Sequence, residues 1–214
     1  MSATIAGVDG CRTGWVVATR DGARVVPSFA AIADEFALIG VDMPIGLPDR
    51  WGRSADRAAR AYIRPRGACV FPTPPRALLD HHDYGEANDA SKARFGAGLT
   101  RQTFHLLPKI REVDAAIEAA TQHRFIEVHP ECSFRALTGS VLAPKRSALG
   151  REQRSCALEA VFGTIEPRIA GARADDVLDA YAVLWTALRH ERGESTILGG
   201  GEVDGRGLVM RIVA

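Results

Sequence analysis

The chain contains little lysine and almost no net charge. Lysine occurs only at positions 92, 109 and 145, so arginine supplies 24 of the 27 basic residues, and the formal net charge is +1. A net charge this close to zero differs from the large positive charge of a strongly basic nucleic-acid-binding protein. A GC-rich genome, whose codons favour arginine and alanine, accounts for the imbalance between the two cations, although the planar guanidinium group also suits phosphate.

Paired cysteines and long apolar segments are also missing. The cysteines at positions 11, 69, 132 and 156 form no C-x-x-C pair and match no zinc-binding spacing. No apolar run approaches the ~20 residues that a membrane-spanning helix needs. The N-terminus lacks the charged flank and apolar core of a signal peptide. The sequence therefore predicts free thiols, no membrane partner and a cytoplasmic location.

The composition is that of an ordinary globular domain. The chain has 214 residues, of which 46% are hydrophobic and 25% charged. Apolar runs and turn residues predict five strands, at 4–9, 15–19, 24–26, 38–42 and 124–129, with one or two more between 197 and 214. Helices are expected at 29–36, 54–63, 84–95, 100–120, 131–137, 151–162 and 176–190. This order predicts one mixed α/β domain over residues 1–214, with a helical insertion at about 50–120.

Acidic residues recur where the chain leaves a regular element. Asp9 ends one apolar run and Asp42 ends another, while Asp176 and Asp179 lie three apart at the start of the last long helix. Two further acids, Glu127 and Glu131, flank Val128-His129-Pro130. A carboxylate at the end of a buried strand is costly for a core but useful for binding a divalent cation. The pattern predicts an enzyme with an acidic metal site.

Magnesium and manganese ions prefer hard oxygen ligands, and two such ions about 3.5–4 Å apart can drive hydrolysis of a phosphate ester. The expected cofactor is therefore Mg²⁺ or Mn²⁺. The predicted metal ligands are Asp9, Asp42, Glu127, Asp176 and Asp179, and the predicted catalytic residues are Asp9, Asp42, Asp176, Asp179 and Glu131. Each acid also has a local alternative role, because a carboxylate can form a turn or cap a helix.

Arginines recur on the helix expected at 54–63. Arg53, Arg57, Arg60 and Arg64 follow one another at steps of four, three and four, which places them in one stripe. Such a stripe suits a nucleic-acid backbone, and a solvated helix face is the alternative. The candidates for contact with a substrate phosphate are Arg12, Lys109, Arg76, Arg57 and Arg60. Phe71 could stack on a base, with core packing as the alternative.

Six segments of the chain resemble one known family in order. They are Gly7–Trp15, Val41–Pro48, Phe71–Arg76, Lys109–Asp114, Glu127–Phe134 and Asp175–Ala180. These motifs are similar to those of domain-of-unknown-function family 429 (DUF429), whose members are described as predicted RNase H-like nucleases. The resemblance covers nearly the whole chain. The activity of that family is itself a prediction, so the resemblance bears on the fold more than on the function.

The resemblance implies a ribonuclease H-like fold. That fold has a five-stranded mixed sheet, with three antiparallel strands followed by parallel ones, and helices on both faces. Among nucleases of this fold, the chain looks most similar to Holliday-junction resolvases and their relatives. Their first acid ends strand one, as Asp9 does, and their second lies at the fourth strand, as Asp42 does. Their last two acids are spaced by three on the final helix, as Asp176 and Asp179 are.

These observations support a metal-dependent nuclease that hydrolyses phosphodiester bonds in structured DNA or RNA. One alternative is an actin-like phosphotransferase or nucleotide hydrolase, because Asp9-Gly10 followed by Gly14 and a hairpin resembles the phosphate loop of those proteins. Such proteins use two domains, which a homodimer of this chain would supply. Another alternative is a non-catalytic nucleic-acid-binding domain, since a fold alone does not establish a reaction.

Overall fold

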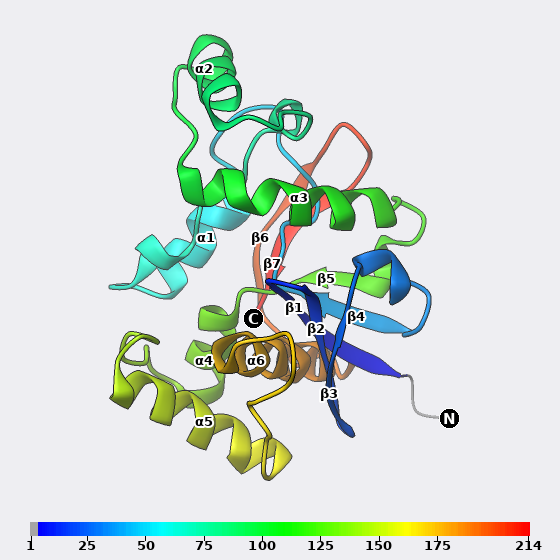
Figure 1. The fold of residues 1–214 in the computed structure, drawn as a ribbon, viewed down its shortest axis with the longest axis vertical. Helices are drawn as coiled ribbons and strands as arrows, with labels where there is room; N and C mark the ends of the chain where they lie inside the picture. Colours follow the sequence, from blue (N-terminus) through cyan, green and yellow to red (C-terminus); the bar gives the residue numbers. More distant parts are fainter. Residues whose placement is uncertain (1–3) are drawn as a thin grey trace.

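A five-stranded mixed sheet forms the centre of the molecule (Figure 1). The computed structural model describes residues 4–214. The spatial order of the strands is β3-β2-β1-β4-β5, with antiparallel pairing from β1 to β3 and parallel pairing from β1 to β4 and β5. The strands are β1 (Ile5–Cys11), β2 (Gly14–Thr19), β3 (Gly22–Val26), β4 (Leu38–Val41) and β5 (Phe125–Glu127). The predicted α/β class, opening meander and mixed sheet are confirmed.

Helices cover both faces of this sheet. Three lie between β4 and β5, namely α1 (Ser54–Tyr62), α2 (Tyr84–Phe95) and α3 (Arg101–Ala116). The other three are α4 (Pro130–Thr138), α5 (Ala148–Phe162) and α6 (Ala174–Glu191). In Figure 1, α3 crosses one face of the sheet and α6 crosses the other, with α4 and α5 on the outer side of α6.

Side-chain alternation along β2 explains this two-sided core. Trp15 and Val17 are buried in the cluster that includes Leu107 and Ile110 of α3. Val16 belongs instead to the cluster built around the apolar side of α6. Because successive strand residues point to opposite faces, a strand that is apolar throughout is buried on both sides.

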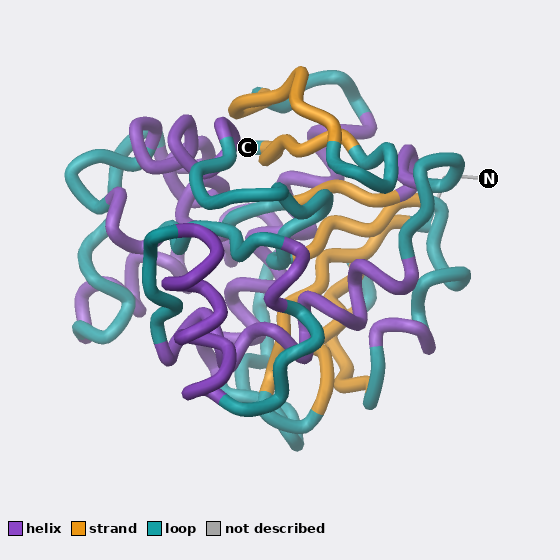
Figure 2. Tube along the Cα trace, turned by 90° about the horizontal axis from the view of Figure 1, so that it is seen from above, coloured by secondary structure: helices purple, strands orange, loops and turns teal. Residues whose placement is uncertain are grey.

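The C-terminal segment forms a separate hairpin. Strands β6 (Ile197–Val203) and β7 (Val209–Val213) pair antiparallel with each other, and Figure 2 shows them standing apart from the five-stranded sheet. One parallel bridge, between Val128 and Val213, links the hairpin to the segment after β5. The prediction of one or two closing strands is confirmed, and the hairpin packs against α1.

The structure corrects several predicted boundaries. The helix expected at 29–36 is a single 3₁₀ turn at Phe29–Ala31, because so short a segment has too few hydrogen bonds to offset helix nucleation. The helix expected to reach residue 120 ends at Ala116, where Ile117 turns to extended backbone angles. The strand expected at 124–129 ends at Glu127, because His129 becomes the N-terminal cap of α4.

Two further expectations concern thiols and membranes. All four cysteines are free in the structure. None of the helices within residues 4–214 is both long and apolar enough to cross a membrane.

Candidate acidic site

The sequence Gly-Val-Asp occurs in two neighbouring strands, as Gly7-Val8-Asp9 within β1, which continues to Cys11 and not only to Asp9 as predicted, and as Gly40-Val41-Asp42 at the end of β4. A Cβ atom on Gly7 would lie 2.1 Å from the backbone nitrogen of Leu184, and one on Gly40 would also meet α6. Helix α6 therefore packs directly on both strands at these glycines. Because strand side chains alternate, Asp9 and Asp42 face the same side as the glycines, toward the N-terminal end of α6.

The backbone holds Asp42 in this position. Its amide nitrogen donates to the carbonyl of Val8 at 2.9 Å, which extends the parallel pairing of β1 and β4 by one residue. The side chain is consequently delivered beside that of Asp9. Both acids lie at the carboxyl ends of parallel strands, which is where ligands bind in open α/β sheets.

Helix α6 supplies two more carboxylates at its N-terminal end. Asp176 lies in the first turn and accepts a hydrogen bond from the backbone nitrogen of Arg173 at 2.9 Å. Asp179 lies almost one turn further and accepts from Lys145 Nζ at 2.9 Å. Residues at i and i+3 share a helix face, and the positive end of the helix dipole favours their ionised forms.

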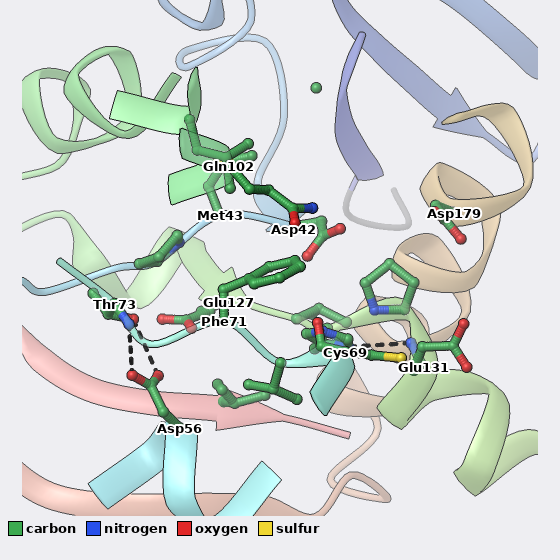
Figure 3. A pocket seen from close by; sticks show the side chains of 18 of the residues that line it. Asp42, Met43, Asp56, Cys69, Phe71, Thr73, Gln102, Glu127, Glu131 and Asp179 are labelled. Carbon is green, nitrogen blue, oxygen red and sulfur yellow. Dashed lines mark hydrogen bonds between the residues drawn. The ribbon is translucent and has the colours of Figure 1, made fainter. Parts of the chain in front are cut away.

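All four aspartates line a single pocket of about 660 Å³, shown in part in Figure 3. Asp9 is 7% exposed and Asp179 is 5% exposed, while Asp42 and Asp176 are half-buried. No donor within residues 4–214 makes a hydrogen bond to the side chain of Asp9 or Asp42. The side-chain oxygens of both residues remain accessible from the pocket, where they are open to a ligand.

Burial and mutual repulsion raise the pKa values of these acids. The pKa of Asp9 lies well above its usual range because of burial, with further contributions from the charges of Asp42, Asp179 and Asp176. Burial, reinforced by Asp179, raises the pKa of Asp42 to about 8. Burial also raises the pKa of Asp179, although Lys145 opposes that shift. Clusters of carboxylates with raised pKa values are typical of functional sites.

The donor set fits a hard divalent cation, since four carboxylates from three elements face one pocket and two of them lack hydrogen-bond donors. As the side chains stand, however, no three acidic, histidine or cysteine groups in the described part of the chain lie close enough together to hold a metal ion. Metal binding would therefore require the carboxylates to turn toward one another.

Glu127 lines the pocket but is engaged by another residue. Arg53 Nη1 and Nη2 donate to its two carboxylate oxygens at 2.7 and 2.5 Å, and the backbone nitrogen of Ile45 donates at 2.8 Å. Arg53, which is 2% exposed, also donates to Asp56. Both carboxylate oxygens of Glu127 thus accept hydrogen bonds from protein donors, whereas the oxygens of Asp9 and Asp42 accept none among residues 4–214. Its role as a metal ligand stays a prediction.

Glu131 has a similar partner. Arg154 Nη2 donates to both of its carboxylate oxygens, at 2.7 and 2.8 Å, and both side chains are buried. The backbone nitrogen of Glu131 donates to His129 Nδ1 at 3.3 Å, while His129 Nε2 faces the carbonyl of Cys69 at 3.4 Å. These contacts make Glu131 a fixed negative charge in the pocket wall.

The residues predicted to contact phosphate do not line this pocket. Lys109 Nζ donates to the carbonyl of Gly14 at 2.6 Å and lies 4.4 Å from the ring centroid of Trp15. Arg60 Nε donates to the carbonyl of Val70 at 2.9 Å. Arg57 bonds to the carbonyl of Gly52, and Arg12 is exposed outside the pocket.

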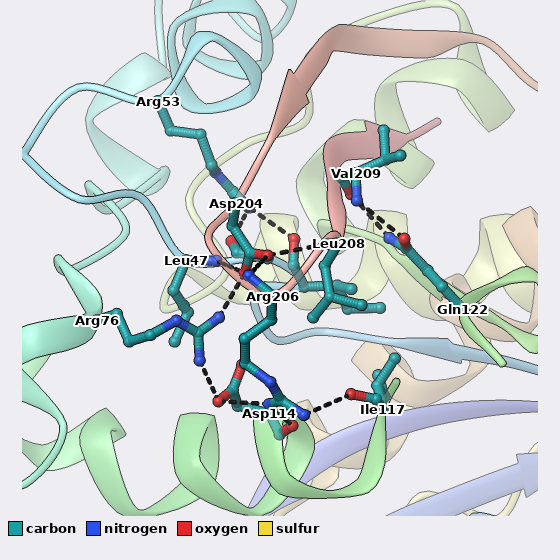
Figure 4. A network of polar contacts seen from close by, with 12 residues as sticks. Leu47, Arg53, Arg76, Asp114, Ile117, Gln122, Asp204, Arg206, Leu208 and Val209 are labelled. Atoms are coloured by element: carbon teal, nitrogen blue, oxygen red, sulfur yellow. Dashed lines mark hydrogen bonds and ion pairs between the residues drawn. The ribbon is translucent and has the colours of Figure 1, made fainter. Parts of the chain in front are cut away.

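Arg76 does not line the pocket but belongs to a separate network of polar contacts (Figure 4). Its guanidinium pairs with Asp114 of α3 and with Asp204 in the turn between β6 and β7. Asp204 also accepts from the backbone nitrogens of Leu47 and Leu208, at 3.0 and 2.9 Å. Arg76 therefore ties the C-terminal hairpin to α3. Its charge is already neutralised, so it does not fit the predicted phosphate-binding role.

The pocket is lined instead by Arg53, the first member of the predicted arginine stripe, and by three cations that the sequence patterns did not single out: Arg66, Lys145 and Arg146. Lys145 and Arg146 come from the segment between α4 and α5, which has no regular periodicity. The pKa of Lys145 is raised chiefly by the charge of Asp179. In the sequence, only the residue type distinguishes Lys145, since it is one of three lysines in an arginine-rich chain.

Comparison with known proteins identifies a family but no activity. The family model described as "Protein of unknown function (DUF429)" matches residues 7–202. Searches of curated proteins and of solved structures found no match.

Proposed function

The chain belongs to the DUF429 family of proteins of unknown function, and we propose that it is a metal-dependent nuclease that hydrolyses phosphodiester bonds with Mg²⁺ or Mn²⁺. One observation carries this proposal. Four aspartates that come from β1, the end of β4 and the start of α6 line one pocket, and Asp9 is buried there without a hydrogen-bond donor among residues 4–214. A hard cation would supply the missing partner.

The sheet supports a ribonuclease H-like fold as part of this proposal. Its strand order is β3-β2-β1-β4-β5, with three antiparallel strands followed by two in parallel. These are the features implied by the resemblance of the sequence motifs. The proposal is further supported by Asp42, which directly follows β4, and by Asp176 and Asp179 on the final helix, whereas Asp9 lies within β1, two residues before its end.

Asp9, Asp42, Asp176 and Asp179 are the proposed metal-holding residues. A bound divalent cation would neutralise these carboxylates, polarise a phosphate oxygen and promote ionisation of water. Glu127 and Glu131 have a structural role in this proposal, because their ion pairs with Arg53 and Arg154 fix the pocket walls that the substrate would contact. Lys145 and Arg146 line the pocket and can attract a phosphate toward the otherwise negative site.

A cleavage panel tests the nuclease proposal. We expect the purified protein to cut at least one nucleic acid among single-stranded DNA, branched DNA and an RNA/DNA hybrid, in the presence of Mn²⁺ or Mg²⁺ but not of EDTA. Asp9→Asn should abolish cutting. Asp49→Asn, a change at an exposed aspartate outside the pocket, is the matched control.

The same panel, with a nucleoside triphosphate added as a further substrate, separates the alternatives. Hydrolysis of a nucleoside triphosphate that depends on Asp9, with no polymer cut, would point to the actin-like phosphotransferase or nucleotide hydrolase. Binding of nucleic acid without any hydrolysis would point to a non-catalytic binding domain. Either outcome would overturn the nuclease proposal.

A further inference from the structure

The acidic pocket has a second, apolar wall that the proposed metal chemistry does not use. Met43, Leu106 and Ile110 line it together with the proline-rich segment 70–74, which includes Phe71. Phe71 is 38% exposed, although phenylalanine is usually buried, and Figure 3 shows its ring within the pocket. The core packing considered as an alternative for Phe71 is therefore not what the structure shows. An exposed aromatic ring inside a concave site is a surface on which a flat apolar group can stack.

The segment that carries Phe71 is held in place. The backbone nitrogen and hydroxyl of Thr73 donate to the carboxylate of Asp56, at 2.8 and 3.0 Å, as drawn in Figure 3. Asp56 is itself fixed by Arg53, which also holds Glu127. One buried network of hydrogen bonds thus fixes the positions of both the apolar wall and Glu127 in the acidic part of the pocket. Because the segment that carries Phe71 is already ordered, binding a ligand there would cost little conformational entropy.

Positive charge lies at the same pocket. Lys145 is 45% exposed at its side chain, and Arg146 is exposed. Arg66 Nη1 donates to the carbonyl of Leu142 at 3.2 Å, which joins the segment before Phe71 to the segment that carries Lys145. A ligand with a flat apolar part and a phosphate would therefore meet matching groups on both walls, with the carboxylates between or beside them.

The size of the site and the use of its arginines argue against a duplex. The pocket volume of about 660 Å³ falls in the range of roughly 300–1,000 Å³ that is usual for small-molecule sites. Proteins that grip a duplex neutralise many phosphates along its backbone. Here Arg53 and Arg60 donate to internal partners, so the predicted stripe of Arg53, Arg57, Arg60 and Arg64 does not form a continuous cationic track.

We propose that this pocket accepts one nucleotide unit, either free or at the end of a single strand, with the base stacked on Phe71 and the phosphate beside Lys145 and the aspartates. This proposal rests on the proposed function and narrows its substrate class from structured DNA or RNA. Base–aromatic stacking is tolerant of sequence, because every base offers a flat face. The site consequently selects for an unpaired base and not for a particular one.

Binding measurements on Phe71 variants test the assignment. The probes are adenosine monophosphate, a hexadeoxyadenylate single strand with hydrolysis-resistant phosphorothioate linkages, and a blunt duplex of the same linkage chemistry, all titrated with Mn²⁺ present. Phe71→Ala should weaken binding of the first two probes by roughly 5- to 150-fold, as expected for the loss of one stacked base. Val161→Ala on α5, a change at another exposed apolar residue that is outside the pocket, should leave binding unchanged.

A second variant, Phe71→Trp, controls for loss of binding that is caused by misfolding of Phe71→Ala. Phe71→Trp keeps an aromatic surface, should retain affinity within a few-fold, and should show quenched fluorescence when adenosine monophosphate binds, relative to the wild-type chain under the same titration. We expect the blunt duplex to bind at least tenfold more weakly than the single strand. Equal or tighter binding of the duplex, or unchanged affinity in Phe71→Ala, would overturn the assignment.

The outcomes also separate this inference from the nuclease proposal. If Phe71→Ala changes nothing while Mn²⁺ binding and Asp9-dependent cleavage persist, the nucleotide assignment fails and the nuclease proposal stands. If nucleotides bind through Phe71 but no Mn²⁺ binds and no diester is cut, the nuclease proposal fails and the assignment of the pocket's occupant stands.

Discussion

Lys145 Nζ donates a hydrogen bond to Asp179 Oδ2 at 2.9 Å and thereby places an ammonium group among the clustered aspartates. Its charge also opposes the raised pKa values of Asp9 and Asp42. Lys145 projects from an irregular segment, and its side chain is 45% exposed. The lysine therefore acts as a counter-ion at the position to which a divalent cation would be attracted.

Removing this counter-ion should tighten metal binding. Lys145→Met keeps most of the apolar stem and deletes the charge, so a divalent cation would no longer compete with an ammonium group. We expect the dissociation constant for Mn²⁺ to fall by roughly tenfold, which corresponds to about 1.4 kcal/mol. Calorimetric titration measures this change. Lys92→Met is the control, because Lys92 is an exposed residue outside the pocket, and an unchanged or weaker affinity in Lys145→Met would contradict the counter-ion role.

The raised pKa values predict an unusual pH dependence of stability. In the metal-free protein the folded-state pKa of Asp42 is about 8, whereas its ordinary value is 3.8. The folded state then binds more protons than the unfolded chain between these values, so this group makes the free energy of unfolding fall as pH rises from about 4 to about 8. Asp42→Asn should remove that contribution and flatten the profile.

Urea unfolding in EDTA at pH 5 and pH 8 tests this prediction. The gain in stability of Asp42→Asn over the wild type should be larger at pH 8 than at pH 5. Asp34→Asn serves as the control, because the Asp34 side chain is 97% exposed. Parallel pH profiles for the wild type and Asp42→Asn would show that the repulsion around Asp42 is absent in solution.

The pair of Arg53 and Glu127 should contribute strongly to stability. Replacing Arg53 with methionine leaves the buried carboxylates of Glu127 and Asp56 without their cation. The expected loss is about 3–5 kcal/mol in the free energy of unfolding. Arg192→Met removes one partner of an exposed pair with Glu194 and should leave the free energy of unfolding almost unchanged. Similar losses for the two variants in chemical denaturation would contradict the structural role assigned to Arg53.

The approach of α6 to β1 makes a separate prediction about Gly7. An added Cβ would meet the backbone of Leu184 at 2.1 Å, and backbone cannot rotate away as a side chain can. Gly7→Ala should therefore cost about 3 kcal/mol and weaken Mn²⁺ binding, because α6 carries Asp176 and Asp179. Gly205→Ala, where a Cβ would meet nothing within 4 Å, is the matched control. Wild-type stability in Gly7→Ala would show that the contact is looser than described.

Local sequence patterns were sufficient to place the four aspartates. Asp9 and Asp42 each follow a short apolar run, and Asp176 and Asp179 open an apolar helix, so the sequence predicted acids near the ends of these elements, although β1 continues two residues beyond Asp9. That both strands carry the same Gly-Val-Asp triplet gives the physical reason for their shared face. The glycines admit α6, and the aspartates two residues later lie beside its N-terminal end.

Long-range ion pairs explain what the sequence did not predict. Glu127 is occupied by Arg53, 74 residues away, and Arg76 pairs with Asp204, 128 residues away. Such partners share no periodicity, and a spacing rule for helices or strands cannot find them. Lys145 lies in an irregular segment, where no pattern indicates the direction of a side chain. The positions of Arg66, Lys145 and Arg146 at the pocket are therefore known only from the folded structure.

The most direct test of the central claim is a calorimetric titration of Mn²⁺ into the wild-type protein and Asp9→Asn at the same pH. We predict saturable binding to the wild type and at least a tenfold loss of affinity in Asp9→Asn, with Asp49→Asn unchanged. Absence of binding to a wild-type protein that is shown to be folded, or equal binding to Asp9→Asn, would contradict the account of these aspartates as a metal site.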